Sequence, residues 1–368
     1  MNENRKIGSG WWSGRISLFF ALMCWGSILC FSFPTVFTSP GFREHYPIPF
    51  LLGLTRTCLI LSYVLGLVGI ILKAKNFTAI AALLLSLLGQ IYIRFFNVLR
   101  FQEVGEGRGL LGLDWFVLNL LMLAIIFVPL ERWRPLHERQ EVFRDGWKLD
   151  LSYFAFSHVL VQFTVYLTIL PAQTFFSKWR GVSILDQVPS LPIWLQFFMI
   201  MLVADFSEYW IHRAFHKFPR LWAFHAVHHG IQKMDWLASS RLHLVDIVAV
   251  RSLTFIPIFI INFSEQATLA YLSFVSIHAI FIHSNFKMNF GVMEKVLVFP
   301  RFHHWHHADE DRAIDKNFAL HFPFWDKLFG SYLLPRDEWP KEYGISDGAN
   351  PPETTFWEQF LWSFKKRS

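Results

Sequence analysis

The chain is short of charged residues and of cysteine. Only 17% of its 368 residues are Asp, Glu, Lys or Arg, against about 25% in an ordinary soluble domain. The three cysteines, Cys24, Cys30 and Cys58, all lie within apolar stretches. They provide neither a disulfide framework nor a thiolate cluster for a metal. The composition therefore speaks against a soluble protein, and any metal chemistry must use other ligands.

Other absences narrow the function further. The sequence has no flavin or nicotinamide motif. The pair His137-Glu138 does not begin an HExxH motif, so the sequence gives no support for a zincin protease. We find no internal repeat and no low-complexity tract. The formal net charge is +6, but the basic residues flank apolar stretches, which speaks against nucleic acid as a partner.

Apolar residues are abundant, at 53% of the chain. A membrane span needs about 20 mainly apolar residues. Arg251 lies inside one candidate stretch and favours a broken or re-entrant segment there. The first apolar stretch is longer than the core of a signal peptide, so we expect it to be a retained anchor. The sequence predicts an all-α, polytopic membrane helix bundle with candidate spans near 16–38, 50–73, 77–96, 109–130, 151–172, 191–211, 246–263 and 267–285.

The chain divides by content into three parts. We expect an N-terminal region of about four spans, a region with every histidine box, and a tail, with bounds 1–148, 149–332 and 333–368. In the tail, Phe356, Phe360 and Phe364 recur at helical spacing, which predicts a short interfacial helix. Docking against the rest of the protein, or disorder, remains open for this segment.

The basic residues predict a topology. They are densest between residues 131 and 148, and the positive-inside rule places such a loop in the cytoplasm. The amino terminus and both histidine-bearing segments then fall on the same side. We therefore expect the histidine-box helices to form a site at the cytoplasmic face.

The histidines carry the strongest signal. Twelve of the sixteen lie between His212 and His307, and a neutral imidazole is the commonest side-chain ligand of transition metals. Residues at i, i+3 and i+4 share one helix face, so each box presents a converging row of nitrogens. The boxes predict a multi-metal centre, and they read His212-Arg-Ala-Phe-His216, His225-Ala-Val-His228-His229 and His303-His304-Trp-His306-His307.

Carboxylates precede the first box. Asp205 and Glu208 fall on nearly one helical stripe with His212 and His216. We expect them to accept hydrogen bonds from imidazole N–H groups and so fix ring orientation. Direct metal ligation and a simple interfacial carboxylate remain alternatives.

The remaining histidines differ in how well they suit metal ligation. His283 is a better candidate ligand than His278, which fits a core or supporting role equally well. His304 is expected to stand outside the ligand set, and His243 to be an orienting or additional ligand. We expect ordinary roles in loops or at the membrane edge for His45, His137, His158 and His321.

Nine histidines are too many for one metal ion with tetrahedral or octahedral demands. Two ions, each with four or five nitrogens, would use the set fully. Zinc has no redox chemistry and would suit hydrolysis or structure, whereas iron would suit activation of O₂. The residue pattern alone leaves the element open.

These motifs resemble the sterol desaturase/fatty acid hydroxylase superfamily. The resemblance covers about residues 149–332, and several boxes occur in order with the expected spacing. The sequence departs from the family pattern at Ala319, where Gly is usual, and at Ser331, where Thr is common. Neither residue lies in a histidine box. Besides the boxes, the resemblance rests on Tyr209-Trp210 after Asp205, on Phe281-Ile-His283-Ser-Asn285, on Pro300-Arg-Phe ahead of His303, on Asp315-Lys-Asn317-Phe and on Trp325-Asp326-Lys-Leu-Phe-Gly330-Ser-Tyr332.

The resemblance implies a membrane-bound non-haem di-iron oxygenase that hydroxylates or desaturates an unactivated C–H bond of a lipid with O₂. It leaves sterols, fatty acyl chains, ether lipids and carotenoids open as substrates. Asp205, Glu208 and Asn285 become candidates to support the metal ligands. The implied iron ligands are His212, His216, His225, His228, His229, His283, His303, His306 and His307.

Partners and location follow from the same resemblance. Electrons must come from a separate donor, such as a cytochrome b5 or a ferredoxin, which the basic loop could dock through Arg134, Arg139 and Arg144. Fixing the topology is an equally good role for this loop. The residues around the last histidine box resemble bacterial members of the family, which favours a bacterial inner membrane over the endoplasmic reticulum. A zinc-loaded or non-catalytic lipid- or metal-binding relative, or a membrane metal transporter, is the alternative.

Overall fold

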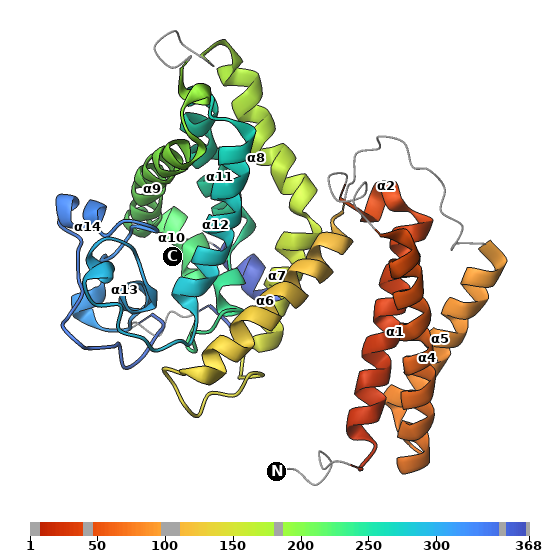
Figure 1. Cartoon of the computed structure of the whole chain (residues 1–368). Coiled ribbons are helices and arrows are strands. Elements are labelled where there is room, and N and C mark those ends of the chain that lie inside the picture. The colour runs from red at the N-terminus through yellow and green to blue at the C-terminus, as the bar shows by residue number, and fades with distance from the viewer. Residues whose placement is uncertain (1–7, 40–46, 97–110, 180–186, 346–350, 366–368) are drawn as a thin grey trace. The chain divides into compact units, whose positions relative to one another are not determined.

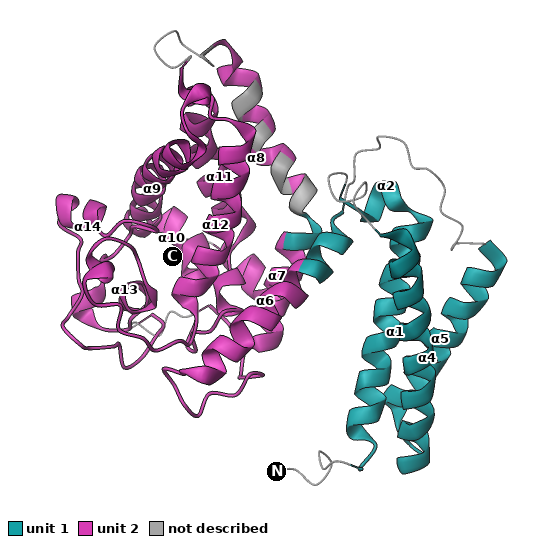
Figure 2. Ribbon diagram, in the orientation of Figure 1, with its two compact units in different colours: residues 1–118, 158–162 teal, residues 119–157, 163–368 magenta. Residues whose placement is uncertain are grey.

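The chain is all-helical wherever it is described. The computed structural model describes residues 8–39, 47–96, 111–179, 187–345 and 351–365, and the regular elements in these ranges are all helices (Figure 1), which confirms the expected fold class. Two compact units are distinguished (Figure 2). The first unit comprises residues 1–118 and 158–162, and the second comprises 119–157 and 163–368.

Three long helices dominate the first unit, and they pack through small residues. The hydroxyl of Ser17 donates to the backbone oxygen of Ser62 at 2.7 Å, and Ser86 donates to the Ser62 hydroxyl at 2.8 Å. A side chain at Gly66 would come within 2.8 Å of Leu83, so the close helix approach requires glycine there. The helices are α1 (Trp11–Ser32), the short α2 (Pro34–Phe37), α4 (Ile48–Leu72) and α5 (Phe77–Phe96).

The second unit gathers its longer helices around α9 (Ile193–Lys217). α10, α11 and α12 all contact α9, and α13 and α14 lie with their loops at one end of this group (Figure 1). A core that includes Ile200, Ala204, Ile258 and Tyr271 joins α9, α11 and α12. The other α-helices are α6 (Leu113–Trp133), α7 (Trp147–Val159), α8 (Val161–Phe176), α10 (Pro219–His229), α11 (Leu244–Ile261), α12 (Glu265–His283), α13 (Pro300–His306), α14 (Phe324–Phe329) and α15 (Phe356–Trp362).

Short 3₁₀ turns punctuate the connections of the second unit. They are η2 (Ser177–Trp179), η3 (Val188–Ser190), η4 (Ala238–Ser240), η5 (Gly291–Lys295) and η6 (Asp311–Ala313). Three of them adjoin the segments that carry histidine boxes: η4 follows the second box, and η5 and η6 lie before and after the third.

Six helices are long and apolar enough to cross a membrane, as in a multi-pass membrane protein: α1, α4, α5, α6, α11 and α12. The expected break at Arg251 is wrong, because α11 continues unbroken through it. The expected span 151–172 is also wrong as a single segment. It is divided between α7 and α8, whose 13 and 16 residues are each short of the roughly 20 that a span requires.

The predicted span 191–211 corresponds to α9, a continuous helix that is not among these six. One stripe of α9 is nevertheless apolar and exposed along its length. Residues four apart on this stripe share a helix face, so the stripe faces outward as it would toward lipid. It consists of Trp194, Phe198, Leu202, Phe206 and Trp210.

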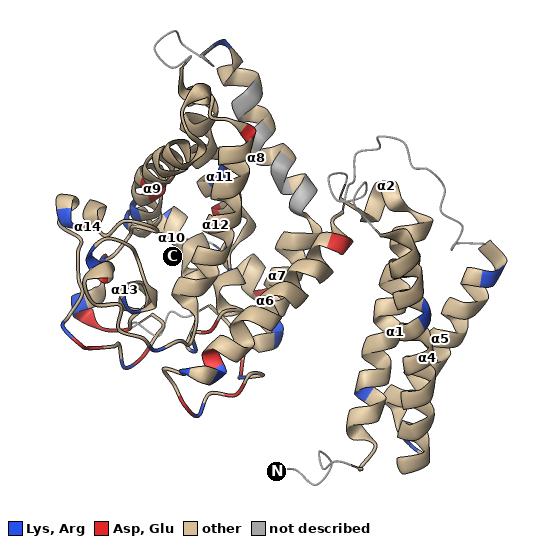
Figure 3. Ribbon diagram, in the orientation of Figure 1, with Lys and Arg blue, Asp and Glu red and all other residues tan. Residues whose placement is uncertain are grey.

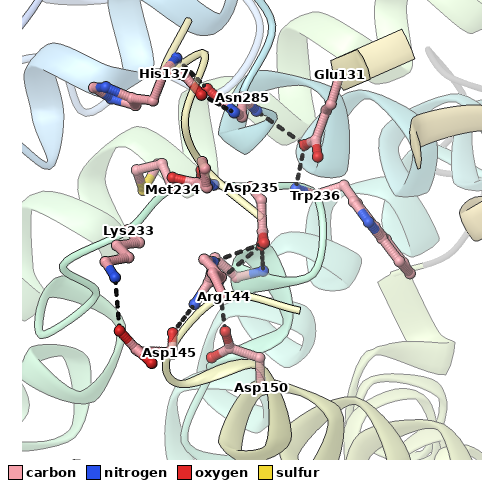
Figure 4. A network of polar contacts seen from close by, with 12 residues as sticks. Glu131, His137, Arg144, Asp145, Asp150, Lys233, Met234, Asp235, Trp236 and Asn285 are labelled. Atoms are coloured by element: carbon pink, nitrogen blue, oxygen red, sulfur yellow. Dashed lines mark hydrogen bonds and ion pairs between the residues drawn. The ribbon is translucent and has the colours of Figure 1, made fainter. Parts of the chain in front are cut away.

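Charged side chains are sparse on α1, α4 and α5 and gather in the loops of the second unit (Figure 3). One group of charges is buried. Arg144 donates to Asp150 and Asp235 at 2.6 and 2.7 Å (Figure 4). Arg241 also donates to Asp150, at 2.6 Å. This ion-pair network ties the loop after α6 to the segment that follows α10.

The tail forms the predicted helix, α15, but its phenylalanines contact protein. Phe356 packs on Tyr153 with ring centroids 4.8 Å apart, and Phe360 stacks on His243 at 4.3 Å. Phe364, just after the helix, is partly exposed but also packs on His243, at 5.3 Å. The helix therefore docks on the second unit with one face.

Candidate metal centre

Four helices bring the histidine boxes together. His212 and His216 lie in the last turns of α9, the second box ends α10, His283 ends α12, and the third box lies in and just after α13. α10 and α13 each begin with proline, Pro219 and Pro300, which suits the first helical position because its missing N–H would be unpaired anyway.

All nine histidines expected as ligands fall into two clusters. The ligand atoms of each cluster lie within 4.8 Å of one another. The clusters do not follow the boxes, since the second and third boxes each contribute to both. The five-histidine cluster is His212, His216, His225, His229 and His306, and the four-histidine cluster is His228, His283, His303 and His307.

The Nε2 atoms point inward. In the five-histidine cluster the Nε2 of His212 lies 2.9 Å from that of His225, and the Nε2 of His229 lies 3.1 Å from that of His216 and 3.0 Å from that of His306. The four-histidine cluster has the same arrangement. Its Nε2 separations are 3.1 Å for His228 and His283, 2.9 Å for His283 and His303, and 3.2 Å for His303 and His307.

Five of the Nδ1 atoms point outward to acceptors. Those of His212, His228, His283 and His306 donate to the backbone oxygens of Phe318, Arg241, Ala279 and Lys316, at 2.9, 3.2, 2.6 and 2.7 Å respectively. The Nδ1 of His225 donates to the Asp246 carboxylate at 2.6 Å. A carbonyl can only accept a hydrogen bond, so the Nδ1 atoms facing one carry the proton.

This proton placement tests whether the clusters fit metal ions. With Nδ1 protonated, a neutral ring has a bare lone pair on Nε2. His212 and His225 then face each other with two lone pairs at 2.9 Å, and so do His228 and His283 at 3.1 Å. Such pairs repel unless a cation lies between them. The donor set therefore fits two metal ions.

The Nε2 separations agree with this reading. A metal ion such as zinc holds imidazole nitrogens at about 2.0–2.1 Å, which puts two of them about 2.8–3.4 Å apart for angles between about 90° and the tetrahedral angle. The observed values of 2.9–3.2 Å fall within this range. Each cluster therefore has the dimensions that a shared metal ion requires.

Burial keeps these imidazoles neutral. It lowers the pKa of His228 and His229 in α10 well below the ordinary 6.5. It has the same effect on the pKa of His303 and His307, and neighbouring histidines add to it. Neutral imidazole is the form that binds a metal.

Asp246, which sequence reasoning missed, supports the centre directly by accepting from His225. It lies in the first turn of the apolar helix α11 and is buried. A carboxylate at the end of a membrane-length segment is costly unless it is paired. The position of Asp246 at the end of an apolar segment was therefore a signal by which the sequence could have identified it.

The two carboxylates expected to support the ligands behave differently. Asp205 is fully buried but accepts from the backbone N–H groups of Leu320, His321 and Phe322, at 2.7–2.9 Å, and not from an imidazole. It thus fixes the loop whose Phe318 oxygen holds His212. Glu208 is partly buried and lies outside both clusters.

Asn285 is bonded away from the clusters. Its side-chain oxygen accepts from the backbone of His137, and its own backbone N–H donates to Glu131 at 2.9 Å (Figure 4). Glu131 also accepts from the backbone of Trp236 at 2.7 Å. Asn285 therefore joins the segment after His283 to the loop after α6.

The other described histidines stand outside both clusters, and His45 lies outside the described residues. His304 bonds to the Tyr343 hydroxyl at 2.8 Å and to the Ser284 oxygen at 3.1 Å. His243 caps α11 by accepting from Val245. His321 lies in a loop, one of the two places expected for it, but it is buried there and pairs with His278 at 3.1 Å.

Comparison with known proteins agrees with the motifs. Residues 197–331 match the family described as fatty acid hydroxylase. The chain is 26% identical to an ornithine lipid hydroxylase, OlsE, of Rhizobium tropici over 42% of the chain and 47% of that protein. It is 28% identical to the alkylglycerol monooxygenase of Homo sapiens over 42% of the chain and 37% of that protein.

A third relative is a Delta(7)-sterol 5(6)-desaturase, erg3B, of Aspergillus fumigatus, at 27% identity over 47% of the chain and 51% of that protein. The chain thus matches about half or less of the length of these relatives. No solved structure is significantly similar. The family match over residues 197–331 and these relatives support the resemblance of the histidine-bearing part of the chain to the sterol desaturase/fatty acid hydroxylase superfamily.

Proposed function

We propose that this protein is a membrane-bound, O₂-dependent oxygenase that hydroxylates or desaturates an unactivated C–H bond of a lipid. The observation that carries the proposal is the pair of imidazole clusters whose Nε2 atoms converge while their Nδ1 atoms are held outward. Nine neutral nitrogens in two groups are a donor set for two metal ions.

Iron is the metal that suits the proposed reaction. The five-histidine cluster would hold one ion and the four-histidine cluster the other. When bound, two iron ions supply the redox chemistry with O₂ that protein side chains lack. In a hydroxylation one oxygen atom of O₂ enters the C–H bond. The other leaves as water, with two electrons and two protons from a donor.

The residues of the chain bind, orient and shield this chemistry. Asp246 and the carbonyls of Phe318, Lys316 and Arg241 fix the rings in the metal-binding tautomer. Aromatic rings cover the five-histidine cluster, with Trp222 and Phe318 each 5.0 Å from His216. These rings exclude water from the inner side of the ligands.

The substrate class follows from the relatives and from the membrane. The names of the relatives refer to an ornithine lipid, an alkylglycerol and a sterol, and all three are lipids with long or fused apolar bodies. A bundle with membrane-length helices beside the clusters suits such a substrate. Fatty acyl chains and carotenoids belong to the same class, and either hydroxylation or desaturation fits it.

Electrons would come from a separate protein, of the cytochrome b5 or ferredoxin type, at the cytoplasmic face of a bacterial inner membrane. The basic loop can serve as its dock only in part. Arg144 is buried in ion pairs with Asp150 and Asp235 and is not free to meet a partner. Arg134 and Arg139 are exposed, so they are the candidate contacts.

The test is reconstitution. The purified protein, loaded with iron in nanodiscs, would receive a membrane lipid extract, an electron donor and ¹⁸O₂. Mass spectrometry should find a lipid that gains one ¹⁸O atom or loses two hydrogens only when iron, donor and O₂ are all present. Iron-loaded protein that consumes no O₂ with any lipid class would contradict the proposal. Retention of zinc alone would favour the hydrolytic or non-catalytic alternative.

A further inference from the structure

The segment between the last two ligand-bearing helices exposes apolar side chains. The 3₁₀ turn η5 lies between His283 of α12 and His303 of α13. Val292 on this turn is 74% exposed, and Met293 and Val296 are exposed as well. An apolar group of this kind on a surface marks a contact with another molecule or with a membrane.

α14 extends the same surface. Phe324 and Leu328, one helical turn apart, share a face and are both exposed. Lys327 of α14 donates a hydrogen bond to the backbone oxygen of Lys295 of η5 at 3.1 Å, which joins the two elements. We call this surface the η5–α14 patch: Val292, Met293, Val296, Phe324 and Leu328.

The exposed charges of the patch's own segments are basic. Lys287, Lys295 and Lys327 are exposed, and one exposed carboxylate beside them, Asp337, accepts a hydrogen bond from Asn289 at 3.3 Å. The carboxylates of η5 and α14 are both turned inward. Glu294 is paired with Arg301, and Asp326 accepts from the backbone of Phe318 and Ala319. The outward face is therefore apolar with an excess of basic charge, which matches an anionic lipid surface.

The patch is continuous with the apolar stripe of α9. The ring of Trp325 in α14 lies 5.0 Å from Phe206, and that of Phe329 lies 4.8 Å from Trp210. Phe206 and Trp210 are the stripe residues nearest to His212. α14 thus lies where the stripe approaches the metal end of α9, which is the level expected for lipid headgroups.

We propose that the η5–α14 patch rests in the anionic headgroup layer of the membrane that holds the helices. The apolar side chains would enter the boundary between headgroups and acyl chains, and the lysines would meet the phosphates. The segment between His283 and His303 would then be anchored to the bilayer. This proposal is independent of the reaction that the centre performs.

Photo-crosslinking tests the proposal without an activity assay. p-Benzoylphenylalanine would replace Val292, Leu328 or, as a matched control, Ile314. The control suits because Ile314 is 55% exposed and Leu328 56%, yet Ile314 lies in the loop after α13, outside the patch. The full chain would be irradiated in nanodiscs of equal parts phosphatidylglycerol and phosphatidylcholine, and lipid adducts identified by mass spectrometry.

We expect adducts at positions 292 and 328, about fivefold richer in phosphatidylglycerol than in phosphatidylcholine, and few at 314. The variant Lys287→Glu/Lys295→Glu should lose this preference, whereas Lys341→Glu, an exposed lysine off the patch, should keep it. Equal or absent adducts at all three positions would overturn the proposal, as would crosslinks to a second copy of the chain. Adducts without a preference for phosphatidylglycerol would overturn the anionic partner.

Discussion

At the scale of residues, the outward nitrogens of the ligands are held unequally. The Nδ1 of His225 has the strongest acceptor, the charged Asp246 carboxylate at 2.6 Å. Those of His303 and His307 are buried and have no hydrogen-bond partner among the described residues. A charged acceptor makes an imidazole a more basic and better oriented ligand. His225 is therefore the ligand whose support is easiest to test.

The variant Asp246→Asn should weaken metal binding at the five-histidine cluster by about 10–100-fold, because the neutral amide polarises His225 less than a carboxylate does. Competition with a chelator, followed by the iron retained per chain, measures this effect. Asp309→Asn is the control, since its carboxylate lies two residues from His307 but makes no described hydrogen bond. Equal iron retention in both variants would contradict the role of Asp246.

Sequence spacing could identify the histidines of the two clusters but not the groups that support them. The i, i+3, i+4 pattern gathers each box on one helix face, and all nine candidates lie in the two clusters. The acceptors are mostly backbone carbonyls, such as those of Lys316 and Arg241. A carbonyl carries no residue signature, so no sequence pattern could have found it.

At the scale of elements, the loop between α13 and α14 delivers two of these carbonyls. Asp315 and Asn317 both have left-handed backbone conformations, with φ of 57° and 62°. Asp and Asn tolerate this region better than other non-glycine residues. Asn317 also donates to the oxygens of Phe302 and Leu333. The loop is thereby held against α13, with Lys316 at His306 and Phe318 at His212.

Asn317→Ala should destabilise the second unit by about 2–4 kcal/mol, because it adds left-handed strain of about 1–2 kcal/mol and removes buried hydrogen bonds. Thermal unfolding in detergent measures the loss. Asp337→Ala is the matched control, since Asp337 has a similar φ of 57° but is exposed, and its only described side-chain hydrogen bond, from Asn289, is exposed as well. It should show the strain without the loss of buried hydrogen bonds. Equal losses in the two variants would show that the hydrogen bonds of Asn317 contribute nothing.

The loop after α6 is a second such element. Its buried Arg144 forms ion pairs that hold the loop, whereas Arg139 is exposed at its surface. Arg144→Ala leaves Asp150 and Asp235 short of a partner in a buried site and should cost about 3–5 kcal/mol of stability. Arg139→Ala, at an exposed position, should leave the melting temperature unchanged. If Arg144→Ala unfolds no more easily than Arg139→Ala, the network does not hold this loop.

Hydropathy predicted where most long helices lie, because their segments are about 20 apolar residues long. It could not predict that 151–172 divides into α7 and α8, since a run of apolar residues does not mark where one helix ends and the next begins. Nor could it predict that α11 continues through Arg251. That outcome depends on where the side chain points, which a linear pattern does not contain.

At the scale of the whole molecule, the described histidines of the metal clusters all belong to the second unit. A metal that binds only the folded state stabilises it by about 2.7 kcal/mol at a concentration 100 times its dissociation constant. Chelation should therefore raise amide hydrogen exchange in α9, α10 and α13 and leave α1, α4 and α5 unchanged. Uniform exchange after chelation would contradict a metal centre confined to the second unit.

The central claim is that the nine histidines hold two metal ions in two separate clusters. Its most direct test is the iron content of the protein and of two variants, measured with Mössbauer spectroscopy on iron-57-loaded samples. We predict two coupled irons per chain in the unaltered protein. His283→Ala removes a ligand of the four-histidine cluster, and His225→Ala removes a ligand of the five-histidine cluster. Each variant should therefore retain one iron that shows no coupling. A single iron in the unaltered protein, or loss of both irons together with the fold intact in each variant, would contradict the claim.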